Sequence, residues 1–110
     1  MSFHLTRTDQ LLIVDVEGQL IVNNRQEFKQ AIIDQIDLGV RTVVVDFTQS
    51  AYIDSSGLGA LVSLGKRLRD LGGDLRLAGL NDDLRTLFEL TRWDSLFPLY
   101  ASRADALAGN

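Results

Sequence analysis

The sequence predicts an α/β fold: a mixed sheet of about five strands, mostly parallel with an N-terminal β-hairpin, and four helices. Two observations predict it. After two strand-like segments, helical and strand-like segments alternate to the end of the chain, which is typical of a parallel sheet. The run Val43-Val44-Val45 is apolar without alternation, which indicates a strand covered on both faces. We expect a single domain over residues 1–110.

Composition limits the classes of function. The 110 residues are 45% hydrophobic, enough for one core, and the net charge of −4 with scattered basic residues argues against nucleic acid as a direct partner. There is no cysteine, and His4 is the one histidine, which excludes thiolate and multi-histidine metal sites. No apolar run approaches the ~20 residues that cross a bilayer. We expect a cytoplasmic protein without membrane insertion, metal or cofactor.

Two strands open the chain. Residues 3–7 alternate in polarity, Asp9-Gln10 suggests a turn, and residues 11–16 form a second strand that Gly18 ends. The second strand places three apolar side chains on one face: Leu12, Val14 and Val16. We expect the two strands to pair as a hairpin, with the first at the edge of the sheet.

A helix is expected next, capped by Asn23 or Asn24 and stopped by Gly39. With Asn24 as the cap, Glu27 takes the third helical position, as in a capping box. Four side chains at helical spacing are expected to face inward: Phe28, Ala31, Ile32 and Ile36. The following strand covers residues 41–47.

The second half of the chain repeats this pattern. A helix over about residues 56–71 ends at Gly72-Gly73, and residues 75–79 form the fourth strand. The residues of this helix that are expected to face inward are Leu58, Leu61, Val62, Leu64, Gly65, Leu68 and Gly72.

Two further helices flank a last short strand. Asn81 caps the first, and Ser102 caps the second. The strand over residues 96–100 contains Pro98, which favours an edge position. The inward residues of the first helix are expected to be Leu84, Leu87, Phe88 and Thr91.

The stretch most suggestive of function is Asp54-Ser55-Ser56-Gly57-Leu58-Gly59. It lies just beyond the carboxyl end of the valine-rich strand and opens the longest helix, where free N–H groups and a partial positive charge favour an anion. A cap needs only one hydroxyl oxygen. We therefore expect one of the two serines to cap the helix and the other to be a phosphate site, with either assignment possible.

This stretch resembles the signature of the STAS domain, and the resemblance covers the whole chain. It includes Val45-Asp46-Phe47 before the stretch, Gly72-Gly73 and Leu77-Ala78-Gly79 after it, and Leu87-Phe88-Glu89-Leu90 beyond. That family covers sulfate transporters and anti-sigma factor antagonists. In size and motif the chain is similar to the stand-alone bacterial anti-sigma factor antagonists.

The resemblance implies a substrate and switch, not an enzyme. Such an antagonist binds an anti-sigma factor that is a serine kinase of the histidine-kinase-like ATPase superfamily, which frees a sigma factor for transcription. The kinase phosphorylates the serine after the motif aspartate, here Ser55, and a phosphatase resets it. Asp54, Ser56, Gly57, Leu58 and Gly59 are implied as the partner-binding residues around Ser55.

One position departs from the family pattern. Antagonists often carry an acidic residue after the Gly-x-Leu near the second strand, and here Gly18-Gln19-Leu20 is followed by Ile21. In the family fold that surface lies near the serine loop and meets the kinase. The departure bears on which kinase is the partner and not on the fold.

Other interpretations of the same residues remain. The Asp-Ser-Ser-Gly stretch could be a plain capping turn, or Gly57-Leu58-Gly59 part of a dinucleotide fingerprint, although Val62 stands at the third glycine position. Asp46 and Asp54 are interpreted as a strand-end polar residue and a turn former, not paired catalytic carboxylates. One alternative function is a STAS scaffold or transporter-associated subunit without phosphorylation. The other is a small α/β enzyme, but the sequence has no Gly-x-Ser-x-Gly nucleophile motif.

Overall fold

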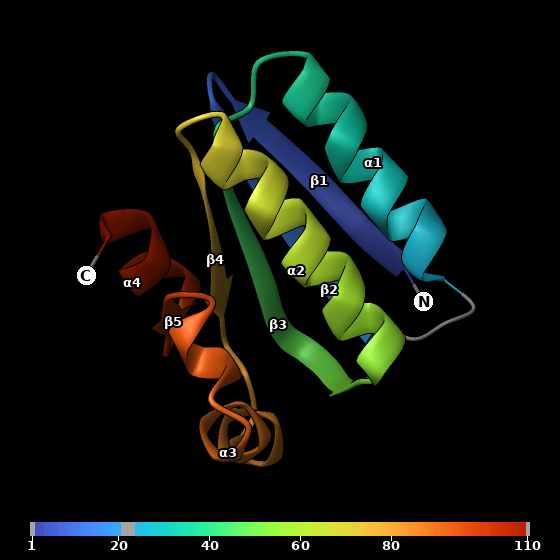
Figure 1. Cartoon of the computed structure of the whole chain (residues 1–110), viewed down its shortest axis with the longest axis vertical. Helices are drawn as coiled ribbons and strands as arrows, with labels where there is room; N and C mark the ends of the chain where they lie inside the picture. The colour runs from blue at the N-terminus through green and yellow to red at the C-terminus, as the bar shows by residue number, and fades with distance from the viewer. Residues whose placement is uncertain (1, 21–23, 110) are drawn as a thin grey trace.

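The computed structural model describes residues 2–20 and 24–109. Its strands are β1 (Ser2–Thr8), β2 (Leu11–Leu20), β3 (Thr42–Ile53), β4 (Asp74–Ala78) and β5 (Leu99–Tyr100). Its helices are α1 (Arg25–Asp37), α2 (Ser55–Asp70), α3 (Asp82–Leu90) and α4 (Arg103–Ala108), with the one-turn 3₁₀ helix η1 at Trp93–Ser95. Figure 1 shows their arrangement.

The five strands form one sheet in the order β1-β2-β3-β4-β5. β1 pairs with β2 antiparallel, through a turn in which Asp9 has a φ of 54°, and the remaining neighbours are parallel. The predicted α/β architecture, including the N-terminal hairpin and the edge position of β1, is confirmed.

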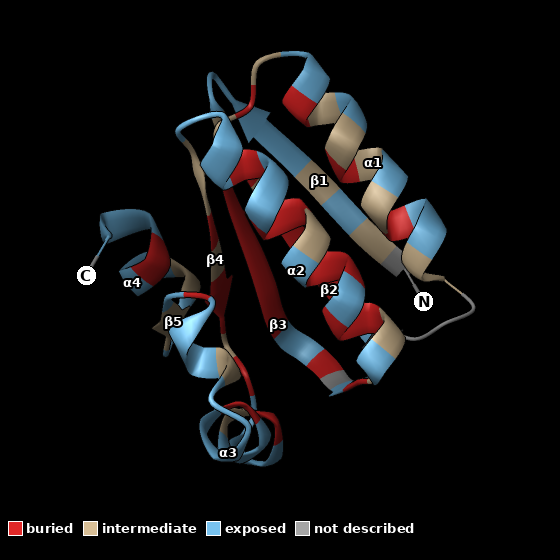
Figure 2. Ribbon diagram, in the orientation of Figure 1, coloured by how far each residue is buried: buried red, intermediate tan, exposed pale blue. Residues whose placement is uncertain are grey.

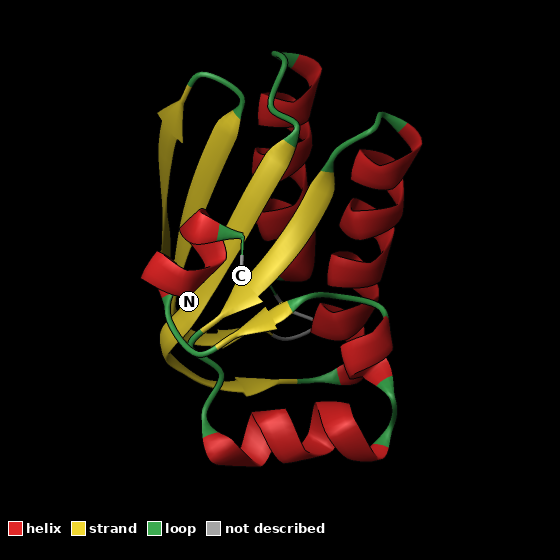
Figure 3. Cartoon of the chain, turned by 90° about the vertical axis from the view of Figure 1, so that its left-hand side faces the viewer, coloured by secondary structure: helices red, strands yellow, loops and turns green. Residues whose placement is uncertain are grey.

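Helices cover the two faces of the sheet unequally. α1 and α2 lie on one face, α4 lies on the other, and α3 lies across one end (Figure 3). The main core fills the space under α1 and α2, where Phe28, Phe47 and Leu61 are fully buried. The cluster under α4 is much smaller, with Val44, Ala78 and Ala106 at its centre. Most of the α4 ribbon is coloured as exposed in Figure 2. Apolar contact therefore holds α4 more weakly than the other helices.

β2 and β3 are longer than the sequence predicts, and Gly18 does not end β2. The parallel pairing continues to Leu20 and Ile53 through two register shifts, one of them at Gly18, where φ is 89°. The Ser50 hydroxyl, in a residue 4% exposed, donates a hydrogen bond to the Gly18 carbonyl oxygen at 2.8 Å. The irregularity thus lets the ladder continue where the prediction placed a loop.

Several inward-facing predictions are wrong. Val62 and Leu87 are 38% and 39% exposed, Gly72 and Thr91 are exposed, and Ala31 is half-buried. The reason for Leu87 and Thr91 is that α3 lies at the end of the sheet and buries only a narrow stripe, made by Leu84 and Phe88. The other inward predictions for α1, α2 and α3 are confirmed.

Two smaller corrections concern element ends. β5 covers only Leu99 and Tyr100, because Pro98 has no N–H to donate and contributes only its carbonyl oxygen, to the Leu77 N–H at 3.1 Å. Asn24 stands at the N-cap position of α1, but its side chain makes no capping bond. Asn23, the other predicted cap, lies outside the described residues.

Candidate functional site

The candidate site is the junction between β3 and α2. Ile53 ends the strand, Ser55 begins the helix, and Asp54 is the only residue between them. Ile53 is 4% exposed and anchors the strand end in the core. The site is therefore built from two rigid elements and not from a loop, which contradicts the predicted connection over residues 48–55.

Asp54, and not a serine, caps α2. Its backbone is extended at φ −90° and ψ 178°, and its carboxylate accepts a hydrogen bond from the Gly57 N–H at 2.8 Å. The prediction that one of the two serines caps the helix is wrong. Aspartate is as good an N-cap as serine, and the spacing of three residues to Gly57 is the usual capping geometry, so the sequence carried this signal.

Both serines are thereby left without a structural task. Ser55 is the first residue of α2 and is exposed, and Ser56 is second and half-buried. Among the described residues neither hydroxyl has a hydrogen-bond partner. The first N–H groups of a helix lack intrahelical acceptors, so the Ser55 side chain stands where an anion is electrostatically favoured.

The remaining motif residues divide into an outer and an inner set. Gly59 is exposed, one helical turn after Ser55, and a Cβ on it would meet no atom within 4 Å. Gly57 and Leu58 are buried, the latter with 6% exposure. Of the implied partner-binding residues, Gly57 and Leu58 thus lie beneath the surface, Asp54 and Ser56 are half-buried, and Gly59 is exposed.

The end of β2 lies beside this junction. Gln19 pairs with Tyr52 and Leu20 with Ile53, so β2 and β3 end side by side at this edge of the sheet. Tyr52 is 49% exposed there. Ile21, the position where the family pattern has an acidic residue, lies outside the described residues.

Asp46 does not lie at the end of a strand, and it does not lie at the junction with Asp54. It lies in the middle of β3 on the face that α4 covers, and its carboxylate accepts hydrogen bonds from the Thr48 backbone N–H and from Arg103 Nε, both at 2.9 Å. Arg103 also pairs with Asp15 of β2. Asp46 is therefore a buried partner of α4 and not part of the candidate site.

Other candidates from the sequence have structural tasks. His4 is exposed on β1, and Trp93 packs edge-on against Phe88 of α3 with ring centres 5.9 Å apart. Arg67 is exposed and pairs with Asp37 at 3.4 Å. In the described part of the chain, no three acidic, histidine or cysteine side chains gather as metal ligands would. Nor does that part hold a helix suited by length and hydropathy to span a bilayer.

The capping role of Asp54 predicts a specific loss of stability. Asp54→Ala removes the acceptor of the Gly57 N–H and is expected to lower the free energy of unfolding by about 1 kcal/mol. Asp54→Asn keeps an acceptor at the same place and is expected to cost only a few tenths. Urea unfolding of the two variants measures both. An equal loss in both would contradict the cap and point to the charge.

Comparison with known proteins shows which family the sequence is similar to. A family model described as the STAS domain matches residues 2–106. The chain is 32% identical over 108 residues to "Putative anti-sigma factor antagonist BtrV" of Bordetella bronchiseptica, covering 98% of this chain and 93% of the relative. It is 30% identical over 91 residues to the anti-sigma-B factor antagonist of Staphylococcus aureus, covering 83% and 84%.

Solved structures share the fold. The unphosphorylated anti-sigma factor antagonist SpoIIAA aligns with a TM-score of 0.77 at 22% identity, over 97% of this chain and 96% of SpoIIAA. The phosphorylated form of Bacillus SpoIIAA aligns with the same score at 19% identity, over 97% of each chain. At these identities the likeness bears on the fold alone.

Proposed function

The chain belongs to the STAS domain family, among its anti-sigma factor antagonists, and we propose that it binds an anti-sigma factor kinase and is released when that kinase phosphorylates Ser55. The relatives are regulators and not enzymes by name. Their names support an anti-sigma factor as the partner, and the geometry of this chain supports Ser55 as the modified serine.

The observation that carries the choice of Ser55 is that Asp54, and not a serine, caps α2. Asp54 supplies the capping oxygen, so phosphorylating Ser55 removes no hydrogen bond that the helix needs. The Ser55 side chain is exposed to an approaching kinase, and Ser56 is half-buried. Ser55 is therefore the better acceptor of the two.

The physics of the modification accounts for a switch. A phosphate brings about −1.5 to −2 charges and three acceptor oxygens. At the first position of α2 the free N–H groups and the helix dipole tolerate that charge, so the fold need not change. The same charge inside a close protein interface is costly to desolvate. Phosphorylation thus acts on the complex and leaves the isolated domain intact.

The remaining parts of the proposal come with this mechanism. The kinase belongs to the histidine-kinase-like ATPase superfamily, a phosphatase restores the serine, and the released partner again holds its sigma factor. All of these steps take place in the cytoplasm. The open space over Gly59, one helical turn after Ser55, admits close approach of the kinase.

Labelling with the cognate kinase tests the assignment. Ser55→Ala is expected to abolish phosphate transfer, and Ser56→Ala is expected to leave it largely intact, because Ser56 is the less accessible hydroxyl. Mass spectrometry of the labelled protein locates the phosphate. Undiminished labelling of Ser55→Ala would refute Ser55 as the target. A pull-down that recovers a membrane-transport component and no kinase-like ATPase would refute the partner.

A further inference from the structure

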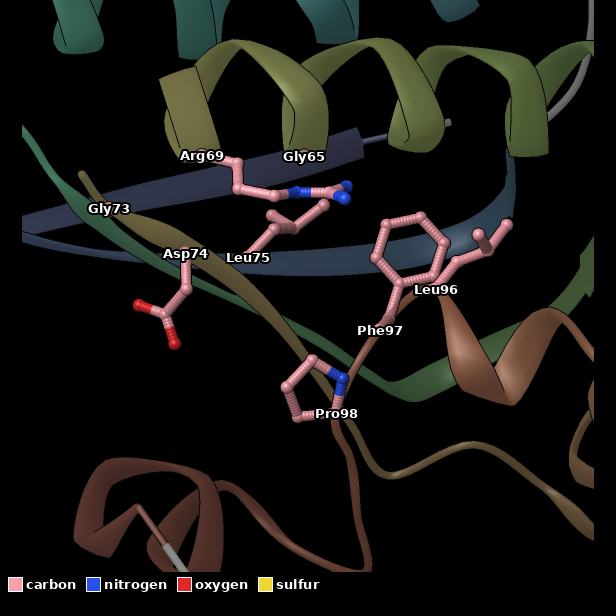
Figure 4. Close-up of a pocket in the computed structure, with 8 residues that line it drawn as sticks. All are labelled: Gly65, Arg69, Gly73, Asp74, Leu75, Leu96, Phe97 and Pro98. Carbon is pink, nitrogen blue, oxygen red and sulfur yellow. The ribbon is translucent and has the colours of Figure 1, made fainter. Parts of the chain in front are cut away.

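A concave site lies at the opposite end of α2 from Ser55. It is a cavity of about 140 Å³ between the last turns of α2, the start of β4 and the segment before β5. Leu75, Phe97 and Pro98 form its apolar walls, and Figure 4 shows Arg69 extending from α2 across Leu75 toward the Phe97 ring. One water takes ~30 Å³ of liquid, so the cavity has room for a compact group of several heavy atoms.

Gly65 leaves room for the aromatic wall of this cavity. A Cβ on Gly65 would lie 3.1 Å from Phe97 Cε1 and 3.7 Å from Leu75 Cδ2, which is tighter than ordinary contact with the ring. The Phe97 ring, in a residue 3% exposed, therefore packs directly against the helix backbone. The ring belongs to the main core cluster, although Phe97 lies in the segment before β5.

The charge at the rim is positive. Within the part of the chain that the structure describes, the Arg69 side chain has no hydrogen bond and no ion pair. Asp74, the acidic residue of the rim, accepts a hydrogen bond from Arg76 Nε at 2.8 Å, so its charge is already compensated. Figure 4 shows its carboxylate directed away from Arg69. An uncompensated guanidinium over an apolar floor suits an anion that has an apolar body.

We propose that this cavity binds a small carboxylate with a compact apolar group, the carboxylate on Arg69 and the apolar group between Leu75 and Phe97. The site does not rest on the proposed phosphorylation. Ser55 and Arg69 are 14 positions apart on α2, about 20 Å along the helix axis. The carboxylate is the natural partner because a guanidinium matches it with two parallel hydrogen bonds.

Amide chemical shifts of the full chain, titrated with benzoate and with its neutral analogue benzamide, test the site. Benzoate is expected to cause saturable shifts centred on Gly65, Gly73, Leu75 and Phe97, and benzamide is expected to bind roughly ten-fold more weakly because it lacks the charge. Equal affinity for the two probes would overturn the proposal, since Arg69 would then contribute nothing. Absence of saturable shifts at these amides would also overturn it.

A pair of arginine variants separates this site from general surface charge. Arg69→Met is expected to weaken benzoate binding roughly ten-fold and to leave the weak benzamide binding unchanged. Arg67→Met removes a neighbouring exposed charge of α2 that lies outside this cavity, and it is expected to leave both affinities unchanged. Equal losses in the two variants would refute a site at Arg69. The comparison of the two probes on the unmodified chain needs no variant to fold.

Discussion

Ser55→Asp is expected to weaken binding of the protein to its anti-sigma factor at least ten-fold, which corresponds to about 1.4 kcal/mol. The carboxylate places a charge at the exposed first position of α2, where the proposed interface would have to desolvate it. The melting temperature is expected to stay unchanged or to rise slightly, because an acidic residue in the first turn of a helix is favourable. Calorimetric titration and thermal unfolding measure the two quantities.

Ala104→Asp provides the matched control. Ala104 is exposed in the first turn of α4, on the opposite face of the sheet, so the same charge meets another helix N-terminus away from the junction. We expect this variant to bind like the unmodified protein. If both variants lost affinity equally, net charge would explain the effect. If neither did, the proposed switch at Ser55 would be refuted.

The layered fold could be predicted because its signals are local. The valine run of β3, the inward stripe of α2 and the caps Asn81 and Ser102 each depend on a few neighbouring residues. The structure confirms the run, both caps and the stripe except at Val62 and Gly72. The caps accept hydrogen bonds from Leu84 N at 2.8 Å and Asp105 N at 3.2 Å. Hydrophobic period and capping chemistry suffice for such elements.

The ends of β2 and β3 could not be predicted because they depend on pairing between distant segments. Ser50 reads as a turn former in isolation, yet its hydroxyl bonds to Gly18, 32 residues away. Gly18 reads as a strand terminator, yet it takes part in an irregular ladder. Only the register of the assembled sheet decides both cases.

The candidate site shows the same division between local and distant signals. The position of the serines at a helix N-terminus was predictable from the strand before it and the helical pattern after it. The prediction placed the cap on one of the two serines and passed over Asp54, which is an equally competent N-cap. The structure decides it, because β3 ends at Ile53 and brings the Asp54 carboxylate to the Gly57 N–H.

Among the side chains near the surface, Arg103 is the one whose removal is expected to lower the free energy of unfolding most. Its guanidinium binds both Asp46 and Asp15, which are paired neighbours on β3 and β2. The Asp46 side chain is 8% exposed, and the Arg103 side chain is 40% exposed. Arg103→Met keeps the apolar stem but leaves two adjacent carboxylates without their cation. We expect a loss of about 2 kcal/mol in the free energy of unfolding, below the full cost of breaking a buried pair because the arginine is partly solvated.

A double-mutant cycle separates this electrostatic role from packing. Asp46→Asn removes the buried charge and keeps an acceptor for the Thr48 N–H, so Arg103→Met should cost at least ~1 kcal/mol less in that background. Urea unfolding measures all four proteins. Purely additive losses would mean that Arg103 stabilises α4 only through its stem. Because few apolar side chains hold α4, the cycle also tests whether this ion pair fixes the C-terminal helix to the sheet.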